Sequence, residues 1–154
     1  MSKKSDNVII NNKAYYNFSI INIFIAGIVL QGWEVKSIRK KKIDISNGYI
    51  LLRSQEAYLN SVKIEFTQIK NNYEKINPLR ERKLLLTKKE INFLFNEVKK
   101  KTYTIVPLSI FWKKNWCKIK IGLSKGKKQY DKRNIEKKKS WKLEQLKIIK
   151  KNIK

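Results

Sequence analysis

Basic and aromatic side chains carry the chemistry that stands out in this sequence. Lys and Arg total 37 against 12 Asp and Glu, a formal net charge of +25. The stretch SKGKKQYDKR (Ser124–Arg133) combines several of these cations with one acid and one tyrosine. Ammonium and guanidinium groups neutralise phosphates, and aromatic rings stack on unpaired bases. This combination indicates a nucleic-acid partner first and an anionic membrane surface second.

Residue types that commonly support catalysis are scarce. The chain has no histidine, and Cys117 is the single cysteine. Without an imidazole partner a thiol nucleophile is not expected, and one cysteine forms no disulfide framework. The acids are scattered without the spacing of a metal site, and no phosphate-binding glycine loop is present. We therefore expect no enzyme, no cofactor and no bound metal.

The net charge alone does not establish a nucleic-acid partner, because an AT-rich genome would also produce many lysines. Lys, Ile and Asn make up 70 of the 154 residues, as such a genome would produce. The positions of the charges must therefore decide. The longest apolar run, Ile20–Leu30, has eleven residues, whereas a membrane span needs about 20. With no recognisable signal peptide, we expect a cytoplasmic protein.

The first half of the chain favours strands. Residues 1–13 lack a pattern and predict a loose arm. Tyr15–Leu30 is rich in isoleucine and aromatics, which predicts a strand, with Gly27 as a bulge or a point of close approach. Val35 and Ile38 predict a short helix with one buried side. That helix would expose Lys36, Arg39 and Lys40.

The middle of the chain has clear turn and cap signals. Residues 49–64 predict two strands about a turn at Ser54–Gln55. Residues 71–77 predict a polar loop that ends at Pro78. Thr87 and Glu90 form a T-x-x-E capping box at a helix start. The core-facing stripe expected behind it is Ile91, Leu94, Phe95 and Val98.

Residues 102–123 predict a β-hairpin that turns near 113–115. Alternation in its second strand separates an apolar face from a basic face that ends in an aromatic ring. The apolar set is Cys117, Ile119, Ile121 and Leu123, and the other set is Trp116, Lys118 and Lys120. Several strands with two or three short helices predict a mainly β fold, a small antiparallel barrel of the OB type.

The last thirty residues are the most basic part of the chain. Residues 125–154 hold 13 basic and 3 acidic residues, a net charge of +10. We expect a tail that is disordered when free and helical on an anionic surface, because its apolar residues fall close to one helical face. They are Leu143, Leu146, Ile149 and Ile153. The expected divisions are an arm at 1–13, a barrel at 14–124 and a tail at 125–154.

No basic cluster is specific when taken singly. Arg80, Arg82 and Lys83 could equally be a solvated strand edge, and Lys118 and Lys120 an ordinary solvent face. Lys137–Lys139 is more typical of a solvated run. Phosphate binding requires many such groups on one surface.

Taken in order, the motifs resemble one family. They are AGIVLQGWEVKSIR (Ala26–Arg39), SNGYILLR (Ser46–Arg53), NPLRERKLLLTKKEI (Asn77–Ile91) and the segment Tyr103–Arg133 that ends in GKKQYDKR. The chain resembles the SmpB (small protein B) family of bacterial ribosome rescue, whose members are partners of transfer-messenger RNA (tmRNA).

This resemblance implies a function. Its body would bind the tRNA-like domain of tmRNA and stand in for the missing anticodon arm. Alanyl-tRNA synthetase and elongation factor Tu would act through tmRNA, and the tail would become helical in the mRNA channel of a stalled ribosome. A structural ribosomal RNA-binding protein is the alternative, because it would share the basic barrel and tail.

The resemblance also implies site residues. The tmRNA-binding set is Lys36, Arg39, Arg80, Arg82, Lys83, Leu85, Lys118, Lys120, Gly126 and Lys128. The set for the decoding centre and the rest of the ribosome is Tyr130, Asp131, Lys132, Arg133, Trp141, Ile148, Ile149 and Lys150. The chain departs from the family pattern at Ile25 (often Glu), Asn77 (Asp), Thr87 (Asn or His), Tyr16 (His) and Tyr130 (an aromatic or His).

Overall fold

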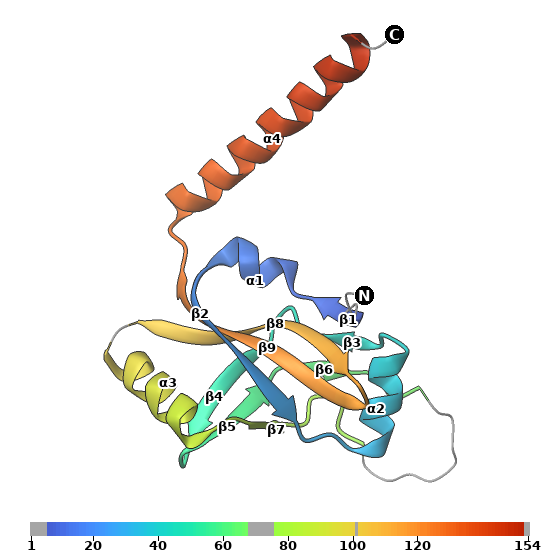
Figure 1. Ribbon diagram of the computed structural model, residues 1–154, viewed down its shortest axis with the longest axis vertical. Coiled ribbons are helices and arrows are strands. Elements are labelled where there is room, and N and C mark those ends of the chain that lie inside the picture. The colour runs from blue at the N-terminus through green and yellow to red at the C-terminus, as the bar shows by residue number, and fades with distance from the viewer. Residues whose placement is uncertain (1–5, 68–75, 101, 153–154) are drawn as a thin grey trace.

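An antiparallel sheet and a long projecting helix dominate the computed structural model (Figure 1), which describes residues 6–67, 76–100 and 102–152. The elements in chain order are β1 (Asp6–Ile10), α1 (Asn12–Asn17), β2 (Phe18–Ile28), α2 (Gly32–Arg39), β3 (Ile43–Asp44), β4 (Tyr49–Arg53), β5 (Glu56–Asn60), β6 (Lys63–Ile64), β7 (Arg82–Leu85), α3 (Lys88–Lys100), β8 (Tyr103–Lys113), β9 (Trp116–Gly126) and α4 (Gln129–Asn152).

Seven strands form one sheet in the order β1-β8-β9-β2-β7-β5-β4, and β3 pairs separately with β6. Every pair is antiparallel. Within the described residues the outer strands β1 and β4 do not pair with each other, so the barrel is not closed. The predicted mainly β, OB-like fold is confirmed in this form, with 40% strand and 36% helix.

The core lies on one face of β9. Cys117, Ile119, Ile121 and Leu123 are all buried, as their alternation predicted. A second, smaller cluster lies on the other side of the sheet, between α1 and β8, and contains Ala14, Val106 and Leu108. A Cβ at Gly122 would lie 3.0 Å from the Leu108 side chain, so a larger residue there would require Leu108 to shift by a few tenths of an ångström. The sheet is therefore covered on both sides where α1 crosses it.

The turn and cap predictions are confirmed. Ser54 (φ 50°) and Gln55 (φ 60°) are both left-handed, as a two-residue hairpin turn requires. β8 and β9 meet at a tight turn in which Lys114 has φ 56°. The Thr87 N–H donates to the Glu90 carboxylate at 2.9 Å, and the Glu90 N–H donates to the Thr87 hydroxyl at 3.3 Å.

The N-terminal predictions are partly wrong. Residues 6–10 are not a loose arm but strand β1, paired with β8. The buried Asn11 side chain anchors the next residues by donating to the Pro107 carbonyl at 2.8 Å. The predicted strand begins at Phe18, because residues 12–17 form α1. Its bulge lies between Ile20 and Asn22 rather than at Gly27. A Cβ added at Gly27 would lie 3.4 Å from the Leu85 side chain, an ordinary contact, so the predicted close approach is not found there either.

Helix α3 buries a narrower stripe than its sequence predicts. Leu94 is fully buried, but Phe95 is 39% exposed. The Lys99 ammonium lies 4.4 Å from the centroid of the Phe95 ring and partly covers it. The helix lies at one end of the sheet (Figure 1), so it has one row of core contacts. The loop predicted over 71–77 falls mostly outside the described residues.

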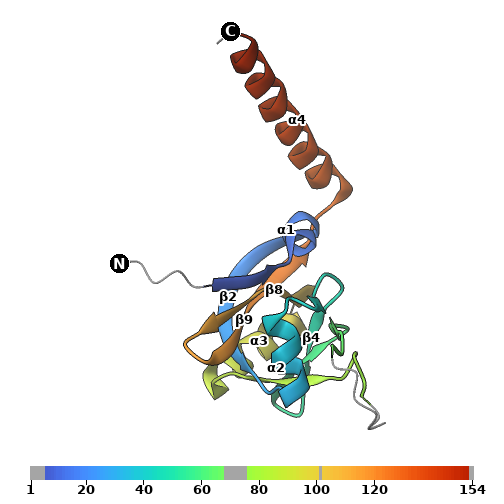
Figure 2. The same cartoon turned by 90° about the vertical axis from the view of Figure 1, so that its right-hand side faces the viewer.

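Helix α4 projects away from the barrel (Figure 2). A disordered tail was expected for the free chain, whereas the structure has 24 consecutive helical residues. The segment 129–152 contains no Gly or Pro and is rich in Lys, Glu, Gln and Leu, which favour helix. No helix in the described ranges has the length and apolar character that crossing a bilayer would require.

Candidate RNA-binding surface

The outward face of β9 and β2 brings several predicted residues together. Lys120 lies directly opposite Ile25 on β2, and Lys118 lies opposite Gly27. On its other side Gly27 pairs with Leu85 of β7. Ile25 is 54% exposed and Leu85 is 56% exposed, so two large apolar side chains lie uncovered beside two lysines. We name this surface the β9–β2 face: Ile25, Leu85, Trp116, Lys118 and Lys120.

Trp116 lies at one end of this face and is 72% exposed. Its position next to the β8–β9 turn is fixed by pairing with Lys113. An exposed indole beside cations suits a flat, electron-rich ligand such as a nucleobase. The predicted basic face with a terminal aromatic is therefore confirmed.

Lys83 lies on the same side of β7 as Leu85 but is already paired. Its ammonium donates to the Glu56 carboxylate at 2.9 Å. The Tyr58 hydroxyl also donates to Glu56, and the Arg53 guanidinium lies 4.7 Å from the Tyr58 ring centroid. The hydrogen bond from Tyr58, and then that from Lys83, lower the pKa of Glu56. An RNA phosphate would thus compete with Glu56 for Lys83.

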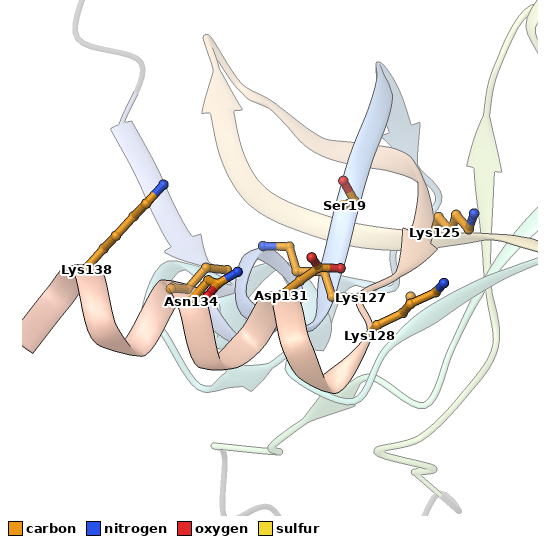
Figure 3. Close-up of a pocket in the computed structure, with 9 residues that line it drawn as sticks. Ser19, Lys125, Lys127, Lys128, Asp131, Asn134 and Lys138 are labelled. Atoms are coloured by element: carbon orange, nitrogen blue, oxygen red, sulfur yellow. The ribbon is translucent and has the colours of Figure 1, made fainter.

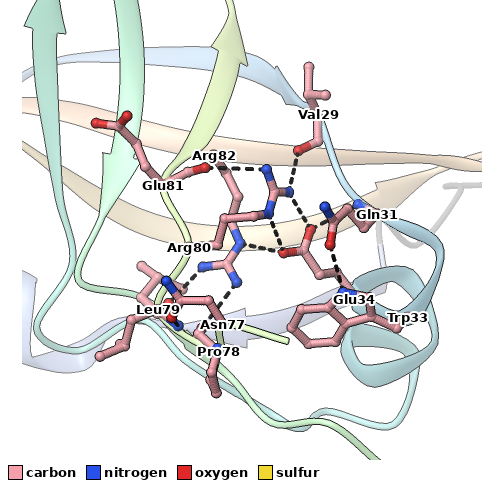
Figure 4. Close-up of polar contacts among 11 residues, drawn as sticks. Val29, Gln31, Trp33, Glu34, Asn77, Pro78, Leu79, Arg80, Glu81 and Arg82 are labelled. Carbon is pink, nitrogen blue, oxygen red and sulfur yellow. Dashed lines mark hydrogen bonds and ion pairs between the residues drawn. The ribbon is translucent and has the colours of Figure 1, made fainter. Parts of the chain in front are cut away.

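The prediction that Arg82 faces RNA is wrong. Its side chain is completely buried and points toward Glu34 and Pro78 (Figure 4). The guanidinium donates to the Glu34 carboxylate at 3.0 Å, to the Val62 carbonyl at 2.7 Å and to the Pro78 carbonyl at 3.1 Å. All of its nitrogens are engaged within the protein, so Arg82 is a structural residue.

Arg80 binds the same carboxylate from the outside. Its Nε and Nη2 lie 3.1 Å and 2.8 Å from the two Glu34 oxygens, and the side chain is 30% exposed. Burial alone would raise the pKa of Glu34, but hydrogen bonds from Arg80 and the Gln31 backbone, with the charge of Arg82, lower it. Arg80 can therefore offer RNA only its outer edge.

Sequence reasoning missed the role of Glu34. The motif GWEVKS contains it, and Glu34 lies three residues after Gln31, whose N–H donates to its carboxylate at 2.9 Å. That spacing is a helix-start signal. Nothing local, however, indicates that two arginines more than forty residues later would bury this acid.

Helix α2 adds a second basic area near the β8–β9 turn. Lys36 and Arg39 are both exposed, as predicted. The Arg39 guanidinium lies over the Trp112 ring, 4.9 Å from its centroid, which brings this cation to the hairpin. Figure 1 shows α2 beside the end of β8 and β9. α2 and the β9–β2 face together offer cations from α2 and β9 and the exposed ring of Trp116.

A cleft lies where β9 passes into α4 (Figure 3). It joins residues predicted for tmRNA to one predicted for the ribosome. Gly126 has open space where a side chain would begin, so its backbone is accessible. Four lysines and one acid make the cleft attractive to anions. Its lining is Ser19, Lys125, Gly126, Lys127, Lys128, Asp131, Asn134, Ile135 and Lys138.

Helix α4 carries the other predicted ribosome-facing residues. Asp131 and Arg133 are exposed in its first turns, whereas Lys132 is half-buried and faces α1. The side chain of Tyr130 lies outside the described residues. Further along, the exposed side chains are Trp141, Ile148, Ile149 and Lys150. The candidate residues thus fall into two regions, the barrel surface and the projecting helix.

Burial also defines the cysteine. Cys117 is free and buried, and burial raises the pKa of its thiol to about 12. The thiolate that a nucleophile or metal ligand requires is therefore strongly disfavoured. Within the described part of the chain, no group of acidic or sulfur side chains has the arrangement of a metal site.

Comparison with known proteins places these features in context. The sequence model of the "SmpB protein" family matches residues 8–151. Proteins named "SsrA-binding protein" from the strains Tuc7, 5A and APS of Buchnera aphidicola subsp. Acyrthosiphon pisum are each 51% identical over 149 residues. The match covers 97% of this chain and 92% of each relative.

A solved structure is similar in fold as well. It is described as "tmRNA-SmpB: a journey to the center of the bacterial ribosome". One of its chains matches with a TM-score of 0.65 and 36% sequence identity, covering 79% of this chain and 85% of that one. The likeness therefore extends over most of the architecture described above.

Proposed function

The chain belongs to the SmpB protein family, and on this premise we propose that it binds tmRNA and brings it to stalled ribosomes during trans-translation. The barrel would bind the tRNA-like domain of tmRNA and take the place of the missing anticodon arm. The protein would act in the cytoplasm as an adaptor that makes and breaks no covalent bond.

The observation that carries the proposal is the β9–β2 face. Lys118 and Lys120 lie beside the exposed Ile25 and Leu85, with Trp116 at one end. Lysines would neutralise phosphates, while apolar and aromatic groups would contact sugars and unstacked bases. RNA loops expose both kinds of group.

Helix α4 supports the ribosomal half of the proposal. Asp131 and Arg133 would contact the decoding centre of the small subunit. The apolar side chains Trp141, Ile148 and Ile149 would pack along the empty mRNA channel while Lys150 meets ribosomal RNA. These apolar groups are 54–63% exposed in the isolated chain, which fits a helix whose partner is another molecule.

Further partners follow from tmRNA itself. A tRNA-like RNA must be aminoacylated and delivered, so alanyl-tRNA synthetase and elongation factor Tu would meet this protein through tmRNA. Helix α4 projects away from the barrel (Figure 1), so ribosome around most of the helix would leave the β9–β2 face free for RNA.

A structural ribosomal protein is the second candidate, because a basic barrel with a long basic helix also suits that role. The two functions differ in RNA choice. Tagged protein recovered from cells with stalled ribosomes should carry tmRNA in amounts comparable to its own. Ribosomal RNA without tmRNA would reject the proposed function in favour of the alternative.

A further inference from the structure

Helix α1 and helix α4 are linked by one tyrosine. The Tyr16 hydroxyl of α1 donates a hydrogen bond to the Glu136 carboxylate of α4. The ammonium groups of Lys132 and Lys139 each lie 6.0 Å from the centroid of the same ring. Positions 132, 136 and 139 are spaced four and three residues apart, so they share one helix face. Tyr16 thus contacts two turns of α4 at once.

The connector between barrel and helix is held by the same part of the chain. The Lys127 N–H donates to the Asn17 carbonyl at 2.9 Å, and its ammonium donates to the Tyr15 carbonyl at 3.0 Å. Gly126 pairs with Phe18 at the end of the sheet. The connector and the first turns of α4 therefore rest on residues 15–18.

Helix α1 is itself anchored to the barrel. Ala14 is buried in the cluster beneath it, and its N–H donates to the Asn11 side chain at 3.1 Å. Asn11 is buried and bonds to the Ile45 and Pro107 carbonyls. A side chain on α1 is therefore fixed relative to the barrel. A residue of α4 that bonds to such a side chain is held in place relative to the barrel as well.

We propose that Tyr16 is a positioning residue that fixes the direction in which α4 leaves the barrel, by bonding Glu136 and lying between Lys132 and Lys139. This inference rests on the proposed function for its purpose: Asp131 and Arg133 would reach the ribosome in one orientation while tmRNA occupies the barrel. The hydroxyl supplies direction through its bond, and the ring supplies contact area for the two ammonium groups.

The geometry of α4 can be measured without RNA. Spin labels would be attached to cysteines introduced by Lys63→Cys on the barrel and Ser140→Cys on α4, because both positions are exposed while Cys117 is buried. The expected distance distribution is narrow for the otherwise unaltered chain. Tyr16→Ala should broaden it widely and Tyr16→Phe partly, whereas the neighbouring control Tyr15→Phe should leave it narrow.

Function is the second measurement. Peptide tagging on stalled ribosomes should fall about tenfold in Tyr16→Ala, the order expected for losing a hydrogen bond to a charged group. The affinity for tmRNA should stay within about twofold, a smaller free-energy change than the loss of one hydrogen bond to a charged group would cause. Glu136→Ala should reproduce both results from the opposite side of the contact. Should Tyr16→Ala not fold, as judged by circular dichroism, Tyr16→Phe and Glu136→Ala decide.

An unchanged narrow distribution in Tyr16→Ala would overturn the inference. So would an unchanged distribution with weakened tmRNA binding, which would make Tyr16 an RNA contact. Absence of tmRNA binding by every variant, including the unaltered chain, would reject the proposed function, while the distance measurement would still judge the role of Tyr16.

Discussion

The Arg82 guanidinium and the Glu34 carboxylate form an ion pair with Nε and Oε1 3.0 Å apart, and neither side chain is exposed to solvent. The pair joins β7 to α2 across 48 residues of sequence. Arg80 binds the same carboxylate from the surface. Arg80 and Arg82, which sequence alone assigns to RNA, therefore connect the β7 region to α2 through Glu34.

Removing Glu34 should destabilise the fold strongly. Glu34→Ala leaves a buried arginine without its partner, a change that costs about 3–5 kcal/mol in proteins. Urea unfolding followed by circular dichroism would measure the loss of free energy of unfolding. As a matched control, Glu81→Ala removes the acid of the exposed Arg53–Glu81 pair and should change stability little. Equal losses of unfolding free energy in the two variants would show that the buried pair stabilises the fold no more than the exposed pair does.

The same acid predicts a pH dependence. The pKa of Glu34 is lowered in the folded state, so its ionised form stabilises the fold. This contribution is complete above the unfolded value of about 4.3 and is lost as pH falls through the lower folded value. Stability of the unaltered chain should therefore drop below about pH 4 more steeply than that of Glu34→Gln. Parallel curves would contradict the assignment.

The buried thiol should be inert in the native protein. Burial raises the pKa of Cys117 to about 12, so little thiolate exists at neutral pH. A disulfide reagent such as Ellman's reagent should label the folded chain slowly, at the rate of unfolding, and label it at once in guanidinium chloride. Rapid stoichiometric labelling of native protein would show that the β9 core opens readily.

Neutralising the β9–β2 face should weaken RNA binding through its salt dependence. Lys118→Ala with Lys120→Ala should reduce the slope of log affinity against log salt by about 0.7–0.9 for each phosphate that the protein no longer neutralises. Lys99→Ala with Lys100→Ala removes the same charge from α3 and serves as the control. If both pairs change the slope equally, general charge rather than this face attracts RNA.

Removing most of helix α4 should separate tmRNA binding from the tagging of stalled peptides. A chain lacking residues 134–154 should keep nearly all of its tmRNA affinity, because the β9–β2 face and α2 remain. It should fail to support tagging of stalled peptides, since most of α4 is gone. Filter binding and an in vitro tagging assay would measure the two effects. A large loss of tmRNA affinity would place part of the RNA site on α4.

Local sequence patterns were sufficient to predict much of the fold. The turn at Ser54–Gln55, the Thr87–Glu90 cap and the alternation along β9 each depend on neighbours within a few residues, and each is confirmed. The same alternation located Lys118 and Lys120 on an outward face. Composition and period capture such features because the backbone geometry that produces them is local.

Long-range partners account for the predictions that were wrong. Strand β1 forms because β8, about a hundred residues later, offers it an edge. Arg82 is buried because Glu34 and two carbonyls can satisfy its nitrogens, and charge counting cannot detect that. Phe95 is exposed because only one row of α3 reaches the core. Each depends on contacts that tertiary structure alone creates.

The most direct measurement is the affinity of the full chain for the transcribed tRNA-like domain of tmRNA, in competition with a ribosomal RNA hairpin of equal length. At about physiological salt the tRNA-like domain should bind at least about tenfold more tightly, since specific contacts add to the electrostatic attraction that both RNAs share. Lys118→Ala with Lys120→Ala should reduce this preference. Equal affinity for the two RNAs would contradict the proposed role in tmRNA recognition.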